Sequence, residues 1–559
     1  MGWSVDPGSA YAAERLEIFL GIPYAEPPLG ERRFAPPETK KLWAPLTLNA
    51  TAFSPICPQV LTFVHLFSFP SSFNNTDEDC LYMNIYTPKF DHMTESLPVM
   101  VWIHGGSYRY GAGQEYDGRP LALEGVVVVT FNFRLGVLGY LSTDDEVAPG
   151  NYGLLDQVLA LEWIRDNIGS FRGDPKRVTI FGESSGGGSV SLHSFSKMSQ
   201  GLFRAIIPQS GCAISPWAIY RPPHNVSDVT RQLASQQNCS VASSQSIIEC
   251  LREVPAKELV RANVLGPPMI AAWAPRVDGH FIDKLPEVLL LNGDFERVPM
   301  FTGTVKDESA DEAKFIPDVA QGFNRTFLEQ LFYSWSTRFG SKTDLAFGAV
   351  KCEYFDANKG FAHNRDIFIQ MKSDYGYVAP HQFLAEKYSA MGPPVWTYSF
   401  QYRSENDVTP KWLGVYHGTE LYYTFGAPFA KEIPCPWGCI NINPDYADWT
   451  EQDRNISKTL MKIWTNFAKT RNPNPVPGMH ANLLPFDTST KAYLLISNVL
   501  SNTTNLKPRR MRFWNYKLPR ILSGQMSIDS VCFSSASKHV ACDIFITLFF
   551  FYLLSACFR

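Results

Sequence analysis

The sequence has no internal repeat, no long run of like charge and no Gly/Ser-rich linker at which its 559 residues could be divided into separate domains. Basic residues form no cluster and the formal net charge is only -4, so nothing indicates a nucleic-acid partner. Hydrophobic residues make up 45% of the chain, which predicts a globular protein rather than a disordered one. We therefore expect one large domain over residues 1–520 and a separate tail over residues 521–559.

Targeting signals are absent at one end of the chain and present at the other. No basic segment followed by an apolar stretch begins at Met1, and Asp6 stands where a myristoylation signal requires serine or threonine, so we interpret the start as truncated. Small residues at 534–537 precede a polar stretch and an apolar segment over 544–558. That order resembles a glycosylphosphatidylinositol (GPI) anchor signal and predicts membrane attachment through the tail.

Glycosylation sequons indicate the secretory pathway. Seven of them lie outside the most apolar runs, at Asn49, Asn74, Asn225, Asn238, Asn324, Asn455 and Asn502. Together with cysteines at loop-like spacings they predict a secreted or cell-surface protein, because disulfides persist in oxidising compartments.

The cysteine spacings suggest particular pairs. Cys57–Cys80 would enclose a polar loop, Cys239–Cys250 a Ser/Gln-rich loop, and Cys435 with Cys439 a tight third one. The alternative is that some cysteines are reduced buried thiols, which is the interpretation we favour for Cys212 and Cys352.

The hydrophobic pattern predicts an α/β fold. Apolar runs without strict polar alternation are typical of strands buried on both faces. They occur at Val99–Ile103, Val126–Phe131, Val178–Phe181, Ala205–Pro208, Pro299–Val305 and Val395–Phe400. A helical pattern from Leu154 to Ile168 separates two of them. Alternation of strands and helices implies a mostly parallel sheet covered by helices, with chemistry at the carboxyl ends of the strands.

One strand runs into a pattern typical of a nucleophile elbow. Val178–Phe181 is followed by Gly182-Glu183-Ser184-Ser185-Gly186 and then by a helical stretch. The glycines permit a tight turn that lifts the hydroxyl of Ser184 clear of the sheet. The bare Gly-x-Ser-x-Gly pattern is common by chance, but its position between strand and helix makes it specific.

A nucleophilic serine needs oxyanion donors, a base and an acid that orients the base. Backbone N–H groups of Gly105 and Gly106, with that of Ser185, would form the oxyanion hole; the alternative is a simple glycine turn. His417 stands on a short loop beside a glycine, although a lone histidine is usually structural. Glu308 is our acid, since it follows the strand ending at Val305; otherwise the acidic residues around it form a solvated loop.

At this point the chain resembles the type B carboxylesterase and cholinesterase family over residues 15–520. The resemblance is carried by the stretches 19–28, 78–84, 150–157 and 179–186. It implies the α/β-hydrolase fold as a single large domain, and a catalytic triad of Ser184, Glu308 and His417. It also implies the Cys57–Cys80 and Cys239–Cys250 disulfides and a salt bridge between Arg33 and Glu78.

The chain departs from the family pattern in three places. Ser309 and Ser107 replace glycines beside the acid and in the oxyanion loop, which questions the geometry of each loop. Met511 stands where the last cysteine of a third cholinesterase disulfide is expected, so we predict that this disulfide is absent.

These features predict a serine carboxylic ester hydrolase that acts on small-molecule esters and needs neither metal nor organic cofactor; they leave its oligomeric state open. The alternatives are a cholinesterase and a cell-surface adhesion protein of the neuroligin type. Against a cholinesterase, no tryptophan lies between Cys57 and Cys80, where only phenylalanines such as Phe69 and Phe73 occur. The expected acyl-pocket phenylalanines fall near Met269 and Ala271, and Asp311 and Glu312 replace aromatic residues after the acid. We therefore predict a broad-specificity carboxylesterase.

Overall fold

The computed structural model describes residues 1–8, 12–60, 75–90, 95–267, 270–356, 359–435, 448–474 and 482–532. Within these ranges the chain forms two compact units. The first comprises Met1–Lys306, Pro380–Pro410 and Val415–Asn505. The second comprises Asp307–Ala379, Lys411–Gly414 and the described residues from Leu506 onward. Two segments of the second unit therefore leave the first and return to it, and the third follows the last segment of the first unit.

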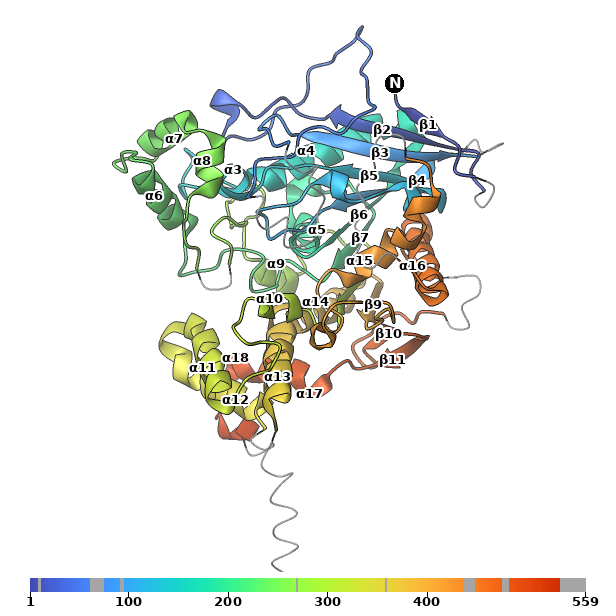
Figure 1. The fold of residues 1–559 in the computed structure, drawn as a ribbon. Coiled ribbons are helices and arrows are strands. Elements are labelled where there is room, and N and C mark those ends of the chain that lie inside the picture. The colour runs from blue at the N-terminus through green and yellow to red at the C-terminus, as the bar shows by residue number, and fades with distance from the viewer. Residues whose placement is uncertain are drawn as a thin grey trace, which may run out of the picture. The chain divides into compact units, whose positions relative to one another are not determined.

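All eleven strands of the described residues belong to one sheet in the first unit (Figure 1). In chain order they are β1 (Trp3–Val5), β2 (Arg15–Pro23), β3 (Tyr82–Lys89), β4 (Leu97–Ile103), β5 (Val127–Phe131), β6 (Gly173–Glu183), β7 (Ala205–Gln209), β8 (Met300–Val305), β9 (Val395–Phe400), β10 (Ala492–Ile496) and β11 (Leu500–Thr504). Their spatial order is β1-β2-β3-β5-β4-β6-β7-β8-β9-β10-β11. Strands from β5 to β10 in this order pair in parallel, and the outer pairs are antiparallel. The predicted α/β class and mostly parallel sheet are confirmed.

The central strands are buried on both faces, as their continuous apolar runs predict. Along β4, Val99 and Val101 belong to one hydrophobic cluster, whereas Met100 and Trp102 belong to another. Because successive side chains of a strand point to opposite faces, the two clusters lie on opposite sides of the sheet. Each fully buried aliphatic side chain contributes roughly 2 kcal/mol to stability, so this double core fixes the sheet that carries the site.

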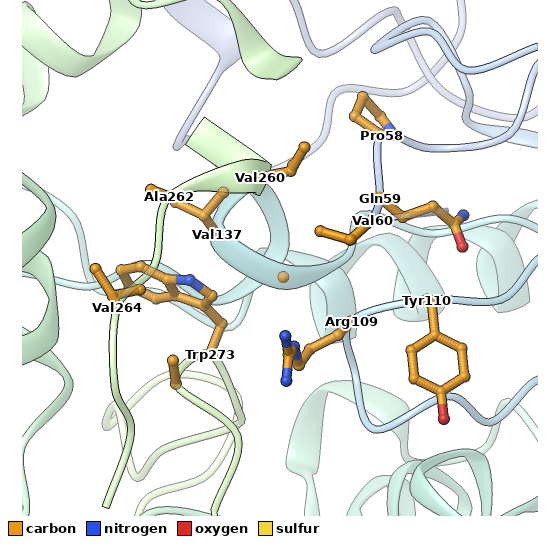
Figure 2. Close-up of a pocket in the computed structure, with 12 residues that line it drawn as sticks. Pro58, Gln59, Val60, Arg109, Tyr110, Val137, Val260, Ala262, Val264 and Trp273 are labelled. Atoms are coloured by element: carbon orange, nitrogen blue, oxygen red, sulfur yellow. The ribbon is translucent and has the colours of Figure 1, made fainter. Parts of the chain in front are cut away.

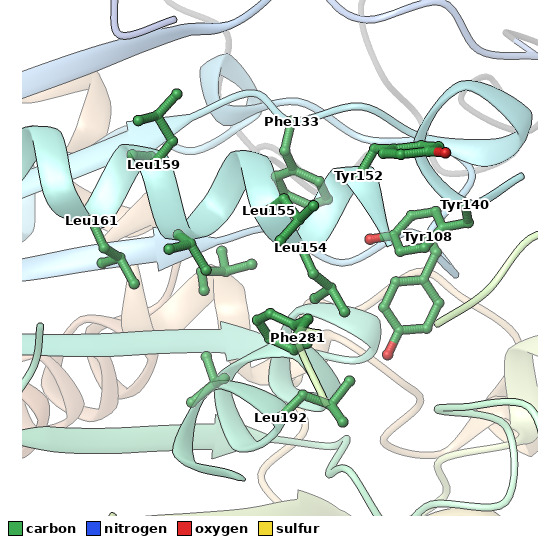
Figure 3. Packing of buried hydrophobic residues seen from close by; sticks show 14 of the residues in the cluster. Tyr108, Phe133, Tyr140, Tyr152, Leu154, Leu155, Leu159, Leu161, Leu192 and Phe281 are labelled. Carbon is green, nitrogen blue, oxygen red and sulfur yellow. The ribbon is translucent and has the colours of Figure 1, made fainter. Parts of the chain in front are cut away.

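Helices of the first unit supply the other half of each cluster. They are α2 (Arg119–Leu123), α3 (Gly136–Tyr140), α4 (Tyr152–Asn167), α5 (Ser185–Phe195), α6 (Val226–Gln236), α7 (Ser244–Glu253), α8 (Ala256–Arg261), α9 (Pro286–Asn292), α14 (Ala379–Ala390), α15 (Thr419–Thr424) and α16 (Glu451–Thr470). Figure 3 shows α4 directing Leu154 and Leu161 into the cluster that also contains Leu192 of α5. On the opposite face, Ile463 and Trp464 of α16 pack into the second cluster.

Every helix or strand that the structure describes in the second unit is a helix. It contains α10 (Ala310–Ala313), α11 (Arg325–Ser336), α12 (Thr343–Tyr354), α13 (Phe361–Ser373), α17 (Pro508–Arg512) and α18 (Leu518–Leu522). A disulfide joins Cys352 of α12 to Cys532, 180 residues later. Our predictions that Cys352 is reduced and that a third disulfide of this kind is absent were therefore wrong. The partner lies beyond Met511, where the family pattern had placed the missing cysteine.

Some predictions concern membrane attachment or residues that the structure does not describe. No helix within the described ranges is long and apolar enough to span a membrane. The apolar segment 544–558 lies outside those ranges, as do Asn74, Phe69, Phe73, Met269 and Cys439. The domain boundaries at 520 and 521 remain a prediction.

Candidate active site

Ser184 occupies the sharp turn between β6 and α5. Its backbone has φ 57° and ψ -126°, a conformation that serine rarely adopts and that persists only where its surroundings enforce it. The flanking glycines explain how the turn is possible: a Cβ at Gly182 would lie 2.5 Å from the carbonyl oxygen of Ile103, and one at Gly186 only 2.0 Å from it. The chain after β6 thus packs against the end of β4 at a distance that side chains would prevent.

Backbone hydrogen bonds hold the serine on both sides. Its N–H donates to the carbonyl of Gln209 at the end of β7 (2.9 Å), and its carbonyl accepts from the N–H of Gly188 in α5 (2.9 Å). Ser184 is partly exposed, whereas its neighbours Glu183 and Ser185 are buried. The arrangement presents one hydroxyl-bearing residue to solvent from an otherwise closed turn.

The glycine loop after β4 lies directly against this serine. A Cβ at Gly105 would be 3.1 Å from the Cβ of Ser184. Among the described residues the backbone N–H groups of Gly105 and Gly106 donate to no acceptor. Two unused donors beside a serine are what an oxyanion hole requires. The N–H of Tyr108 donates to the Oγ of Ser185 (3.2 Å), which ties the loop to α5.

Ser107 stands in this loop where the family pattern has a third glycine. Its φ is 55° and that of Tyr108 is 60°, so both residues adopt the left-handed conformation that glycine would take. This conformation costs an ordinary residue roughly 1 kcal/mol. Ser107 therefore carries some backbone strain. Although it is not a glycine, it adopts a left-handed backbone conformation in this loop.

His417 precedes Gly418, which caps α15 with φ 79°. Its Nε2 lies 3.1 Å from the Oε1 of Glu183, and the two side chains are only 15% and 7% exposed. Glu183 immediately precedes Ser184, so the histidine lies at the elbow. Our sequence analysis assigned no role to Glu183. Its position between Gly182 and Ser184, next to the nucleophile, could have indicated one.

Other buried histidines have structural partners. His193 contacts the Oγ of Ser199 (2.7 Å) and the Oε1 of Gln157 (2.9 Å). His104 contacts the carbonyl of Gly105 (2.8 Å) and stacks on Phe133. Burial lowers the pKa of His104 to about 4, with the Gly105 contact acting in the opposite direction. Burial likewise lowers the pKa of His193 to about 3. These two imidazoles are held by partners outside the elbow, whereas His417 lies beside the residue that precedes Ser184.

Glu308 belongs to the second unit, three residues after β8 ends. It is fully buried. Glu312 has a different environment, because it forms an ion pair with Lys372 and accepts a hydrogen bond from the hydroxyl of Tyr377 (3.1 Å). Ser309, which replaces a glycine, has an ordinary φ of -92° and donates its N–H to the Oγ of Ser373 (3.0 Å), so this position does not require glycine.

The predicted cross-links around the site are present. Cys57–Cys80 and Cys239–Cys250 are bonded, and Arg33 forms two hydrogen bonds with the carboxylate of Glu78, one of them 2.7 Å long. Cys212 is a buried free thiol, and burial raises its pKa to about 11, against hydrogen bonds that lower it. Cys435 is disulfide-bonded.

The described residues hold no cluster of His, Cys, Asp or Glu suited to a metal ion.

Six of the seven sequons fall within the described residues. The asparagine of Asn502 is partly exposed. The asparagines of the other five sequons are exposed: Asn49, Asn225, Asn238, Asn324 and Asn455.

The sequence matches known proteins over most of its length. The model of the carboxylesterase family matches residues 7–514. Neuroligin-2 of Homo sapiens is 35% identical over 556 residues, which cover 90% of this chain and 65% of the relative. Neuroligin-3 of Mus musculus is 34% identical over 564 residues, covering 90% and 66%. The chain thus spans a little under two thirds of the length of these curated relatives.

Proposed function

The chain belongs to the carboxylesterase family, an α/β-hydrolase family, and from that premise we propose that it hydrolyses carboxylic esters through an acyl-enzyme on Ser184. The observation that carries the proposal is the conformation of Ser184, a partly exposed serine at φ 57° beside two unused backbone donors. Strain of this kind is retained where a function needs it. Its substrates are small-molecule esters.

In this mechanism His417 takes the proton of the Ser184 hydroxyl as the oxygen attacks the ester carbonyl. The N–H groups of Gly105, Gly106 and Ser185 stabilise the negative charge that develops on the carbonyl oxygen, each donor contributing roughly a hundredfold or more in rate. The imidazolium then protonates the leaving alkoxide, which departs as the alcohol. Water, deprotonated by the same imidazole, attacks the acyl-enzyme and releases the carboxylic acid.

Glu308 has the role of the acid that orients His417. Support for this role comes from chain order, since serine, acid and histidine follow one another as in the family, and from the position of Glu308 just after β8. Complete burial of its side chain favours an engaged carboxylate over the solvated acidic loop that was the alternative.

Labelling with a fluorophosphonate tests the proposal, because the reagent phosphonylates only an activated serine. We expect wild-type protein to be labelled and Ser184→Ala to be unlabelled and inactive while still folded. Ser189→Ala is the matched control: Ser189 lies in α5, and its buried Oγ has no hydrogen-bond partner among the described residues. Labelling of Ser184→Ala, or no labelling of wild type, contradicts the proposal.

A second candidate is a cell-surface adhesion protein, favoured by the 35% identity to Neuroligin-2 over 90% of the chain. A purely adhesive role needs no nucleophile, whereas this chain retains Ser184, His417 and the oxyanion glycines. The two functions separate in one comparison. Adhesion is established and the esterase excluded if two results are obtained together. No fluorophosphonate labels the wild-type protein, and the Ser184→Ala variant still supports cell aggregation.

The compartment follows from the cross-links. Three disulfides are typical of an extracellular protein. We further propose that the protein is secreted or held at the cell surface, with glycans on the exposed sequons and a GPI lipid in place of the apolar tail. Release of the protein from cells by a phosphatidylinositol-specific phospholipase tests the lipid, and resistance to release counts against it.

A further inference from the structure

The side chain of Gln59 is buried, and every polar group of its carboxamide forms a hydrogen bond. Its Nε2 donates to the carbonyls of Cys57 and Gly111 (3.0 Å each), and its Oε1 accepts from the N–H of Gly111 (2.8 Å). Figure 2 shows Gln59 beside Tyr110, the residue before Gly111, at a small cavity that Trp273 also lines. One side chain therefore holds both backbone groups of Gly111.

Gly111 in turn packs against the first peptide of the glycine loop. A Cβ at Gly111 would lie 2.5 Å from the Nδ1 of His104 and 2.8 Å from the carbonyl oxygen of Gly105. These two atoms form a hydrogen bond of 2.8 Å, in which the carbonyl accepts and the imidazole nitrogen therefore donates. The φ of Gly111 is 113°, so both the close approach and the backbone conformation at this position favour glycine.

The carbonyl of Gly105 and the N–H of Gly106 belong to one planar peptide group. The two groups point in opposite directions because this peptide is trans, so the contact that fixes the carbonyl also fixes the N–H. The next peptide is fixed as well, since the carbonyl of Gly106 accepts from the N–H groups of Arg109 (2.9 Å) and Tyr110 (3.1 Å). The direction of the Gly106 donor thus depends on contacts that lead to Gly111.

We propose that Gln59 is a positioning residue for the oxyanion hole. Its carboxamide holds Gly111, and Gly111 holds the peptide that carries the N–H of Gly106. The inference rests on the esterase function proposed above and adds a residue that acts through the loop rather than on the substrate. Because a preorganised donor acts on charge that develops in the transition state, loss of the carboxamide lowers kcat more than it changes KM.

The alternative is that Gln59 only fills space beside the loop or supports the fold. A second link joins the same two segments: the Oδ1 of Asn132 accepts from the N–H of Gly113 (2.9 Å), and its Nδ2 donates to the carbonyl of Pro55 (3.2 Å). The Cys57–Cys80 disulfide also holds the segment that carries Gln59. We therefore expect variants at Gln59 to fold.

Gln59→Met removes the hydrogen bonds and keeps the length of the side chain. We expect kcat for a neutral ester to fall by about tenfold or more, with little change in KM. A trifluoromethyl ketone, whose carbonyl carbon bonds to the oxygen of an activated serine, places an oxyanion in the hole and should lose inhibitory potency by a similar factor. The matched methyl ketone adds to serine far less readily and should lose little.

Gln59→Glu supplies a readout that packing alone does not move. A neutral carboxyl accepts from the N–H of Gly111 and donates to its carbonyl, as the amide does, whereas a carboxylate faces carbonyl oxygens with no hydrogen to donate. Burial raises the pKa of such a carboxyl. We expect the ratio of kcat in this variant to kcat in wild type to be highest near pH 5 and to fall by about tenfold or more by about pH 9. Ionisation of His417 affects both proteins and cancels in the ratio.

Gln157→Met and Gln157→Glu are the matched controls. Gln157 is fully buried in α4, and its Oε1 contacts the Nε2 of His193 (2.9 Å), outside the glycine loop. Its substitutions remove a buried carboxamide or introduce a buried carboxyl, as those at Gln59 do. We expect kcat to stay near the wild-type value, and its ratio to wild type to stay level across the pH range.

The outcomes separate the two proposals. If wild type hydrolyses esters while Gln59→Met keeps a near-normal kcat, or while the Gln59→Glu ratio stays level with pH, the positioning role is wrong and the esterase stands. If wild type hydrolyses no ester, the esterase proposal fails, and hydrogen–deuterium exchange decides whether Gln59 holds the loop. Faster exchange at residues 104–111 in Gln59→Met, but not in Gln157→Met, supports that contact, and equal exchange refutes it.

Discussion

The Nε2 atom of His417 lies 3.1 Å from the Oε1 atom of Glu183, the residue that precedes Ser184. In the proposed mechanism this nitrogen acquires a proton when the serine attacks. A carboxylate at this distance stabilises the imidazolium, since opposite charges attract strongly where side chains are only 15% and 7% exposed. We therefore expect Glu183 to act through the histidine as a positioning residue.

Glu183→Gln tests this coupling. The amide keeps the shape of the side chain but removes its charge, so protonation of the histidine becomes less favourable. Because the reaction requires a neutral imidazole, we expect the acidic limb of the kcat/KM profile to move to lower pH, with a reduced maximum. Measuring hydrolysis of a neutral ester between pH 4 and 9 shows the shift.

The matched control is Glu115→Gln. Glu115 is also a buried carboxyl, but burial raises its pKa to about 8, against a backbone hydrogen bond from Ala112 that lowers it. It is therefore neutral across the acidic limb, and its substitution should not move that limb. An unchanged limb in Glu183→Gln, or an equal shift in both variants, contradicts the role of Glu183.

Glu115 itself makes stability depend on pH. Its Oε1 has no hydrogen-bond partner among the described residues, and the side chain is 2% exposed. The folded-state pKa of about 8 lies above the ordinary value of 4.5, so the folded state binds the proton more tightly than the unfolded state. This contribution is fully present below pH 4.5, decreases as pH rises, and is lost above pH 8.

We therefore expect wild type to lose on the order of a few kcal/mol more stability between pH 5 and 8 than Glu115→Gln does. Denaturant unfolding of both proteins at several pH values measures the difference, in which contributions from the remaining groups cancel. Parallel stability curves for the two proteins would show that Glu115 ionises in the folded state as it does in the unfolded chain.

Sequence patterns located the central strands and the elbow because both depend on local chemistry. The run Val395–Phe400 matches β9 residue for residue, and the helical pattern from Leu154 corresponds to α4 at Tyr152–Asn167. Strands buried on both faces must be apolar throughout, and an elbow needs glycines at fixed offsets from Ser184. Such signals lie within one short segment.

Features built from distant segments were not predictable in this way. Cys352 pairs with Cys532 across 180 residues, and no local spacing encodes that pair. The division into two units follows from contacts between separated stretches, so no linker marks it. Nothing near Arg109 in the sequence distinguishes it from other surface arginines. In the folded chain it lines a cavity together with Trp273, which is distant in sequence.

Gly105 should tolerate no side chain if its N–H is an oxyanion donor. A Cβ there would lie 2.8 Å from the carbonyl oxygen of Glu183 and 3.1 Å from the Cβ of Ser184, so the loop must move away from the nucleophile. We expect Gly105→Ala to lower kcat by about a hundredfold or more while KM changes little, because the donor acts on the transition state.

Gly169→Ala is the control for this prediction, since a Cβ at Gly169 meets nothing within 4 Å and its φ needs no glycine. Full activity is expected there. If Gly105→Ala retains near-normal kcat while its circular dichroism matches that of wild type, the loop does not hold the oxyanion.

The last prediction concerns choline esters. Recognition of a quaternary ammonium uses aromatic faces, tryptophan above all, and no tryptophan lies between Cys57 and Cys80. Trp273 lines the cavity beside the glycine loop, but it shares that cavity with the cationic Arg109. An adjoining cavity is lined by Lys257 and Arg261 and by the acidic Asp77 and Glu78, of which Glu78 is paired with Arg33.

Acetylthiocholine and 3,3-dimethylbutyl thioacetate have the same shape and differ by one charge, so their kcat/KM values isolate the electrostatic effect. We expect the neutral ester to be preferred, and the preference to weaken as salt screens the exposed cations. Butyrylthiocholine, compared with acetylthiocholine, tests whether the acyl side accepts longer chains, as the alanine at 271 in place of an aromatic residue predicts. A strong preference for acetylthiocholine over both other esters would identify a cholinesterase and overturn the proposal of a broad-specificity carboxylesterase.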